Sequence, residues 1–95
     1  MDKNGKDLPP EKKHMLLFMM LVKQNEEIAK INLGEIPNPT TNLLEVDLKS
    51  ARFAIDTLEM MQAYTKGNIS DQATDYLSDI ISRLNTTYRN IENEG

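Results

Sequence analysis

The eight prolines and glycines are gathered into short segments of the chain. Proline removes an amide donor from a helix, and glycine commonly ends one by adopting a left-handed conformation. The three stretches between these segments are long, and apolar side chains recur in them at intervals of three and four residues. The sequence therefore predicts an all-α fold, a three-helix bundle with helices at about residues 10–32, 45–66 and 70–92.

Residues near the expected helix ends support these boundaries. Pro9 and Pro10 suit the first turn of a helix, where their missing amide hydrogens would have no partner. Gly34 and Gly67 suit the left-handed position that follows a helix. Ser70 is a typical N-cap for the third helix.

The start of the second helix is less sharply defined. The connection at residues 35–42 contains two prolines and cannot be helical. Asn42 and Glu45 have the spacing of a capping box, and Asp47 offers a second possible cap. The second helix is therefore expected to begin between residues 43 and 48.

Length and composition limit the classes of protein. Ninety-five residues make one domain, which we expect over residues 9–95, with residues 1–8 as a disordered tail. The absence of cysteine excludes disulfides and thiolate metal sites. The net charge is −4 without a cluster of lysines and arginines, so we expect no binding to nucleic acid.

The apolar run Met15–Val22 resembles a signal peptide only superficially. Its eight residues are followed by polar residues without a small-residue cleavage pattern. A membrane-spanning helix needs about 20 apolar residues, so no membrane span is expected. The cytoplasm is the expected location.

The first two helices carry more apolar perimeter than the third. At 100° per residue each has two apolar stripes, whereas the third helix has a single arc of roughly 140°. A closed bundle needs one broad face per helix, and a large exposed apolar patch usually marks an interface. We expect a homodimer that packs the first two helices across a two-fold axis, unless one deep core takes up both stripes. The candidate interface residues are Met15, Phe18, Met19, Val22, Phe53, Met60 and Tyr64.

The methionines offer a second interpretation of this surface. Met15, Met19, Met20, Met60 and Met61 could form an adaptable groove for a helix of another protein. They could equally fill the core.

Few residues suggest chemistry. His14 is the single histidine and lacks the further ligand or orienting acid that a metal or nucleophile site requires. Asp47 and Asp56 lie about 180° apart around one helix, so they cannot act as an acid–base pair. Asp47 is better explained as a helix-start residue and Asp56 as the i,i+4 partner of Arg52. We expect no catalytic residues, no metal, no cofactor and no enzymatic activity.

The turn between the second and third helices faintly resembles a phosphate-binding loop. It places a lysine and one glycine before a helix N-terminus, but a full loop has two spaced glycines and follows a strand. A C-cap followed by an N-cap explains the same residues. The candidate anion-binding residues are Lys66, Gly67, Asn68 and Ser70.

Spaced residues from about Phe18 to Tyr88 give the chain a family resemblance. The most specific part is the segment IDTLEMM at residues 55–61 followed by TKGN at residues 65–68. With Leu33-Gly34, Pro37 and Pro39 before it, and Leu77 and Leu84 after it, the pattern resembles the bacterial domain-of-unknown-function family 1844. The resemblance implies a bacterial origin and an all-helical fold, and it implies no activity.

Two hypotheses of function follow from the sequence. The first is a non-enzymatic protein–protein interaction module that acts as a homodimer. Its partner is expected to be a second copy of the chain, or else another protein. The alternative is a regulatory protein that binds a small ligand or an anion at residues 67–71.

Overall fold

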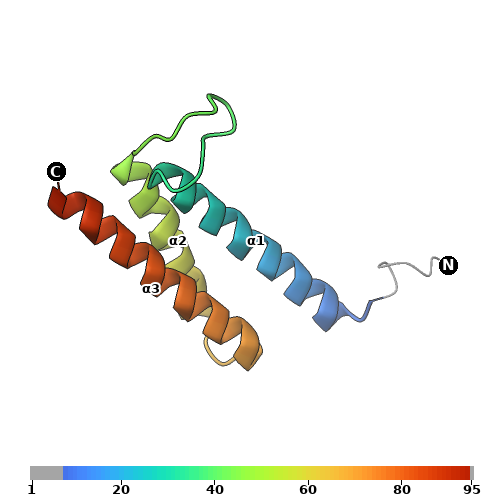
Figure 1. The fold of residues 1–95 in the computed structure, drawn as a ribbon. Coiled ribbons are helices and arrows are strands. Elements are labelled where there is room, and N and C mark those ends of the chain that lie inside the picture. Colours follow the sequence, from blue (N-terminus) through green and yellow to red (C-terminus); the bar gives the residue numbers. More distant parts are fainter. Residues whose placement is uncertain (1–7, 95) are drawn as a thin grey trace.

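A computed structural model describes residues 8–94, which form three helices in sequence (Figure 1). Helix α1 spans Pro10–Asn32, α2 spans Leu48–Thr65 and α3 spans Asp71–Glu94. The predicted all-α three-helix fold is confirmed. Of the tail expected at residues 1–8, all but Leu8 lies outside the described residues.

Helix α2 begins at the last of the positions that the sequence allows. The Asp47 side chain accepts a hydrogen bond from the Ser50 backbone N–H at 3.1 Å and another from the Ser50 hydroxyl at 2.9 Å. Of the two caps that the sequence leaves open, the helix uses Asp47, and Asn42 lies in the connection with a φ of 62°. The helix therefore starts three residues after the expected residue 45.

The two glycines act as predicted. Gly34 and Gly67 have φ values of 77° and 82°, which non-glycine residues rarely adopt. A Cβ on Gly34 would also lie 3.1 Å from the Val46 side chain. Gly34 thus reverses the chain where Leu33 and Val46 form an isolated antiparallel bridge.

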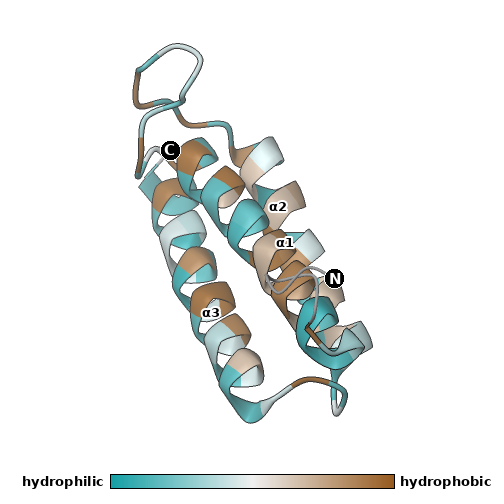
Figure 2. Ribbon diagram, turned by 90° about the vertical axis from the view of Figure 1, so that its right-hand side faces the viewer, coloured by the Kyte–Doolittle hydropathy of each residue, from teal (hydrophilic) through white to brown (hydrophobic). Residues whose placement is uncertain are grey.

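The connection between α1 and α2 extends beyond the ends of the helices (Figures 1 and 2). Its turn is built around Asn38, whose side chain accepts from the Thr40 backbone N–H at 2.8 Å and donates to Glu45 at 3.2 Å. Leu43 and Leu44 lie exposed in this connection. The bounds expected from the sequence, about 45–66, include Val46, but Val46 lies in the connection because α2 begins only at Leu48.

Helix α2 packs against both other helices, whereas α1 and α3 contact each other less extensively (Figure 1). Three alanines, Ala29 of α1 and Ala51 and Ala54 of α2, are almost completely buried, and small side chains allow helices to approach closely. The largest fully buried side chains come from all three helices: Ile55, Leu58, Leu77, Ile80 and Val22.

Among residues 8–94 no helix is long and apolar enough to cross a membrane.

The Asp47 cap predicts a pH-dependent stability. Hydrogen bonds from the Ser50 backbone and hydroxyl lower the pKa of Asp47 below 3.8. A lowered pKa stabilises the folded state above pH 3.8, and this stabilisation is lost as the pH falls through the folded-state pKa. We expect Asp47→Ala to lower the urea midpoint at neutral pH, and the difference from the unmodified protein to shrink in acid. Asp47→Asn is the control, because it keeps an acceptor that does not titrate. An equal loss at all pH values would contradict this role.

Candidate functional site

The most distinctive surface of the described chain is a line of exposed apolar side chains on α1 and α2, which we call the apolar strip. Phe53 and Tyr64 of α2 retain 76% and 80% of their surface, well beyond what a packed aromatic residue exposes. The strip consists of Leu17, Leu21 and Ile28 of α1 and Phe53, Met60 and Tyr64 of α2.

The strip lies on the side of the α1–α2 pair that faces away from α3. Helix α3 contacts α2 through Gln62 and Arg52, which bond to Ser78 and Asn85. At 100° per residue Arg52 and Gln62 lie about 100° and 180° around α2 from the middle of the strip. On α1, Glu26 bonds to Tyr76 of α3 and lies about 160° from the middle of the strip. On both helices the buried residues fill the arc between the strip and the side that faces α3, so the strip adjoins the edge at which α1 and α2 meet. The two halves therefore form one face.

The two halves of the strip have the same spacing. Including one polar position on each helix, α2 carries Phe53, Thr57, Met60 and Tyr64 at intervals of four, three and four residues. Read in the opposite direction, α1 carries Ile28, Gln24, Leu21 and Leu17 at the same intervals. Intervals of four and three produce the packing seam of a coiled coil.

Antiparallel pairing places equivalent positions side by side. The Asp47 backbone N–H donates to the Asn32 carbonyl at 2.8 Å, which fixes the relative height of α1 and α2. A rise of about 1.5 Å per residue from this bond puts Gln24 and Thr57 within about 3 Å of the same height. The same offset of about 3 Å holds for the other three pairs. The strip thus has four layers: Ile28 with Phe53, Gln24 with Thr57, Leu21 with Met60, and Leu17 with Tyr64.

The structure corrects the predicted interface on α1. Val22 is completely buried, and Phe18 and Met19 pack against the core, so the α1 side expected at the interface faces the interior. Met15 is half-buried. On α2, the predicted residues Phe53, Met60 and Tyr64 are exposed. The α1 half of the strip was missed, although its matching spacing is present in the sequence.

The methionines are divided between core and surface. Met61 is buried and Met19 packs against the core, whereas Met20 and Met60 are exposed on different helices. Met15 and Met19 line a shallow hollow of about 270 Å³ against the start of α3. The five methionines therefore do not share one groove.

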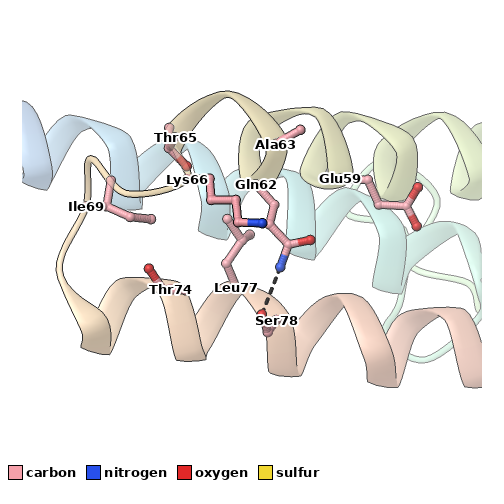
Figure 3. Close-up of a pocket in the computed structure, with 9 residues that line it drawn as sticks. All are labelled: Glu59, Gln62, Ala63, Thr65, Lys66, Ile69, Thr74, Leu77 and Ser78. Carbon is pink, nitrogen blue, oxygen red and sulfur yellow. Dashed lines mark hydrogen bonds between the residues drawn. The ribbon is translucent and has the colours of Figure 1, made fainter.

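A hollow of about 450 Å³ lies between the end of α2 and the start of α3 (Figure 3). Ile69 and Leu77 supply apolar lining, and a hydrogen bond of 2.8 Å from Gln62 to Ser78 crosses it. Lys66 extends along the hollow towards Gln62 (Figure 3).

The turn beside this hollow has the predicted helix-ending geometry. The Asn68 backbone N–H donates to the Thr65 carbonyl, and the Ser70 hydroxyl accepts from the Ala73 backbone N–H at 3.1 Å. Asp71 already places a carboxylate in the first turn of α3. The predicted cap at Ser70 is confirmed.

A polar cluster fastens α1 to α3. The Tyr76 hydroxyl donates to the buried Glu26 carboxylate at 2.5 Å, and Lys30 forms an ion pair with Glu26 at 3.3 Å. The Lys23 ammonium lies over the Tyr76 ring, 4.7 Å from its centre. Burial and the bond to Glu26 raise the pKa of Tyr76. Each group has a partner within the cluster, which identifies it as a structural contact.

A second polar cluster fastens α2 to α3. Arg52 bonds to Asp56 at 3.0 Å, which confirms the predicted i,i+4 pair, and it donates to Asn85 at 3.1 Å. Its guanidinium also lies over the Tyr88 ring.

The described residues contain no group of three histidine or acidic side chains placed to hold a metal ion. His14 is exposed on the first turns of α1.

The chain matches a known protein family over most of its length. Residues 15–90 match the model of a family described as Domain of unknown function (DUF1844). Neither a curated protein nor a solved structure matches the chain.

Tyr76→Phe tests the polar cluster between α1 and α3. Removing the hydroxyl leaves the buried Glu26 carboxylate short of a donor, so we expect a loss of about 1–2 kcal/mol in the free energy of unfolding. Because the folded-state pKa of Tyr76 is raised, its stabilisation is complete below pH 10 and is lost as the pH rises through that pKa. Urea titration at neutral and alkaline pH measures both effects. Tyr88→Phe is the matched control, since it keeps the ring over Arg52, and an equal loss in both variants would contradict a specific role for Tyr76.

Proposed function

We propose that this chain, which belongs to the DUF1844 family of unknown function, is a non-enzymatic interaction module that acts as a homodimer. The observation that carries the proposal is the apolar strip on the side of α1 and α2 opposite α3. Membership of the family neither supports nor opposes a homodimer.

The size of the strip supports association. Its six side chains expose roughly 700 Å² of mainly apolar surface, given the 150–250 Å² that an aromatic residue can bury. Each partner of a standard interface contributes about 800 Å², which is close to this total. Phe53 and Tyr64 are aromatic, and aromatic residues are enriched in interfaces. Tyrosine is also among the residues that contribute most of the binding energy.

The symmetry of the strip supports a second copy as the partner. A two-fold dimer uses the same patch on both subunits, so the patch must complement itself. Here the two antiparallel halves have the same spacing, and their paired positions lie within about 3 Å of the same height. Each half presents a coiled-coil seam, and two such hairpins placed face to face make a four-helix core. Another protein or a membrane surface would need no such internal match.

We also propose that the chain has no enzymatic activity. In support, the polar clusters join helices to one another, through Glu26 with Tyr76 and through Arg52 with Asn85.

The alternative, an anion site at residues 67–71, has one observation in its favour. Lys66 lines the hollow beside the start of α3. Two carboxylates oppose it: Asp71 lies in the first turn of α3 and Asp75 follows one turn later, so both repel an anion there.

Leu21→Lys tests the proposed dimer. A lysine in the strip would bury a charge without a partner, so we expect the dissociation constant to rise roughly a hundred-fold. Sedimentation equilibrium at tens of micromolar protein should give twice 10.8 kDa for the unmodified chain and 10.8 kDa for the variant.

Leu16→Lys is the matched control for this experiment. Leu16 lies on the same helix and is as exposed as Leu21, 53% against 52%, but it points about 120° away from the strip. It should leave the dimer intact. A monomer mass for the unmodified chain would overturn the proposal, and equal weakening by both variants would move the interface away from the strip.

Inorganic phosphate tests the alternative. We expect millimolar phosphate to leave the amide resonances of residues 67–73 unchanged in a heteronuclear NMR titration, because Asp71 and Asp75 repel it. Saturable shifts confined to these residues would instead support the anion site, and sodium chloride at equal ionic strength controls for screening.

A further inference from the structure

We infer that the two copies pair with their α1–α2 connections at the same end, so that α1 of one copy lies against α2 of its partner. This inference rests on the proposed dimer and adds its orientation. It is carried by the one polar layer of the strip, Gln24 with Thr57.

Two face-to-face arrangements can bring all four layers into contact. If the two-fold axis runs along the helices, each layer meets its own copy. Gln24 then faces Thr57 of the partner subunit. If the axis runs across the helices, the order of the layers is reversed in the second copy, and Gln24 faces Leu21 of the partner subunit.

Hydrogen bonding distinguishes the two arrangements. The Thr57 hydroxyl donates its proton to the Phe53 carbonyl at 2.8 Å, which leaves its oxygen free to accept. The Gln24 amide is exposed and bonds to no other residue among those described. In the first arrangement this amide can donate to the partner's Thr57 hydroxyl. In the second it is buried against leucine without a partner, and an unpaired buried polar group is unfavourable.

The apolar layers are compatible with the first arrangement. Ile28 faces the partner's Phe53, and Leu17 faces the partner's Tyr64, so each large aromatic ring meets a branched aliphatic side chain. A single polar position within an apolar seam is a known means of fixing register and orientation in helical assemblies. Gln24 and Thr57 supply such a position on both helices at one height.

Spin-label distances test the orientation directly, because the sequence has no cysteine and each introduced cysteine is unique. Thr40→Cys labels the α1–α2 connection, and Asn68→Cys labels the opposite end of the hairpin. With the connections together, both variants should give distances between the two copies below about 30 Å. With the connections apart, the two labels of each variant lie at opposite ends of the dimer. The length of α2, about 27 Å, then separates them along the helices, and both distances should exceed about 30 Å.

Removing the polar layer should remove the preference for pairing with the connections at the same end. In Gln24→Leu combined with Thr57→Val, all four layers are apolar and both arrangements are satisfied. We expect a dimer that binds at least as tightly, with a second, long distance from the Thr40 label. Gln24→Asn keeps an amide at this position and should keep one short distance.

The outcomes separate this inference from the proposed dimer. Short distances in the otherwise unmodified chain, together with both a short and a long distance in the double variant, support the proposed orientation. Long distances in the labelled, otherwise unmodified chain overturn the orientation and leave the dimer standing. A short distance that persists alone in the double variant overturns the role of the polar layer. A monomer by sedimentation, with no distance between copies, overturns both proposals.

Discussion

Helix α3 covers α1 and α2 from one side, and the exposed surface of the molecule follows from that contact. Its apolar residues form one arc, which packs on the core through Leu77, Ile80 and Leu84. Polar contacts at its edges hold it in place, from Tyr76 to Glu26 on α1 and from Asn85 to Arg52 on α2. A single helix cannot cover two opposite sides of a helical pair. The second stripe of α1 and that of α2 therefore remain at the surface.

The close contact between α1 and α2 makes these two stripes into one face. Ala29, Ala51 and Ala54 are buried almost completely, and their small size brings the helices together. The Asp47–Asn32 hydrogen bond then sets the relative height of the two helices. Larger residues at the three alanine positions would separate the helices and turn one continuous strip into two isolated lines. The functional surface thus depends on packing at residues that do not belong to it.

The ends of the helices were predictable because their causes are local. Gly34, Gly67 and Ser70 act within a few residues of their own positions, and the structure confirms each of them. The start of α2 was only bracketed, since Asn42 and Asp47 are both acceptable caps. The bridge between Leu33 and Val46, which keeps the chain extended as far as Asp47, depends on a contact between distant segments.

The location of the candidate surface was predicted for α2 and missed for α1. Periodicity shows that α1 has two apolar stripes, but the position of α3 decides which of them is buried. Leu21 and Val22 are adjacent in sequence and differ by 100° around the helix, and only Val22 faces the core. The Glu26–Tyr76 bond joins residues fifty positions apart. No local pattern specifies it.

The polar layer exchanges some affinity for selectivity in the proposed dimer. A strip with four apolar layers would bind more strongly, but it would accept either orientation and many other apolar surfaces. Gln24 and Thr57 divide the strip, so no run of more than two apolar layers is exposed before association. Any partner that covers the whole strip must offer a hydrogen-bond partner to the Gln24 amide, in the layer that Gln24 shares with Thr57. A second copy of the chain meets that requirement with the residues it already has, and this match is the physical reason for favouring self-association over binding to an unrelated apolar surface.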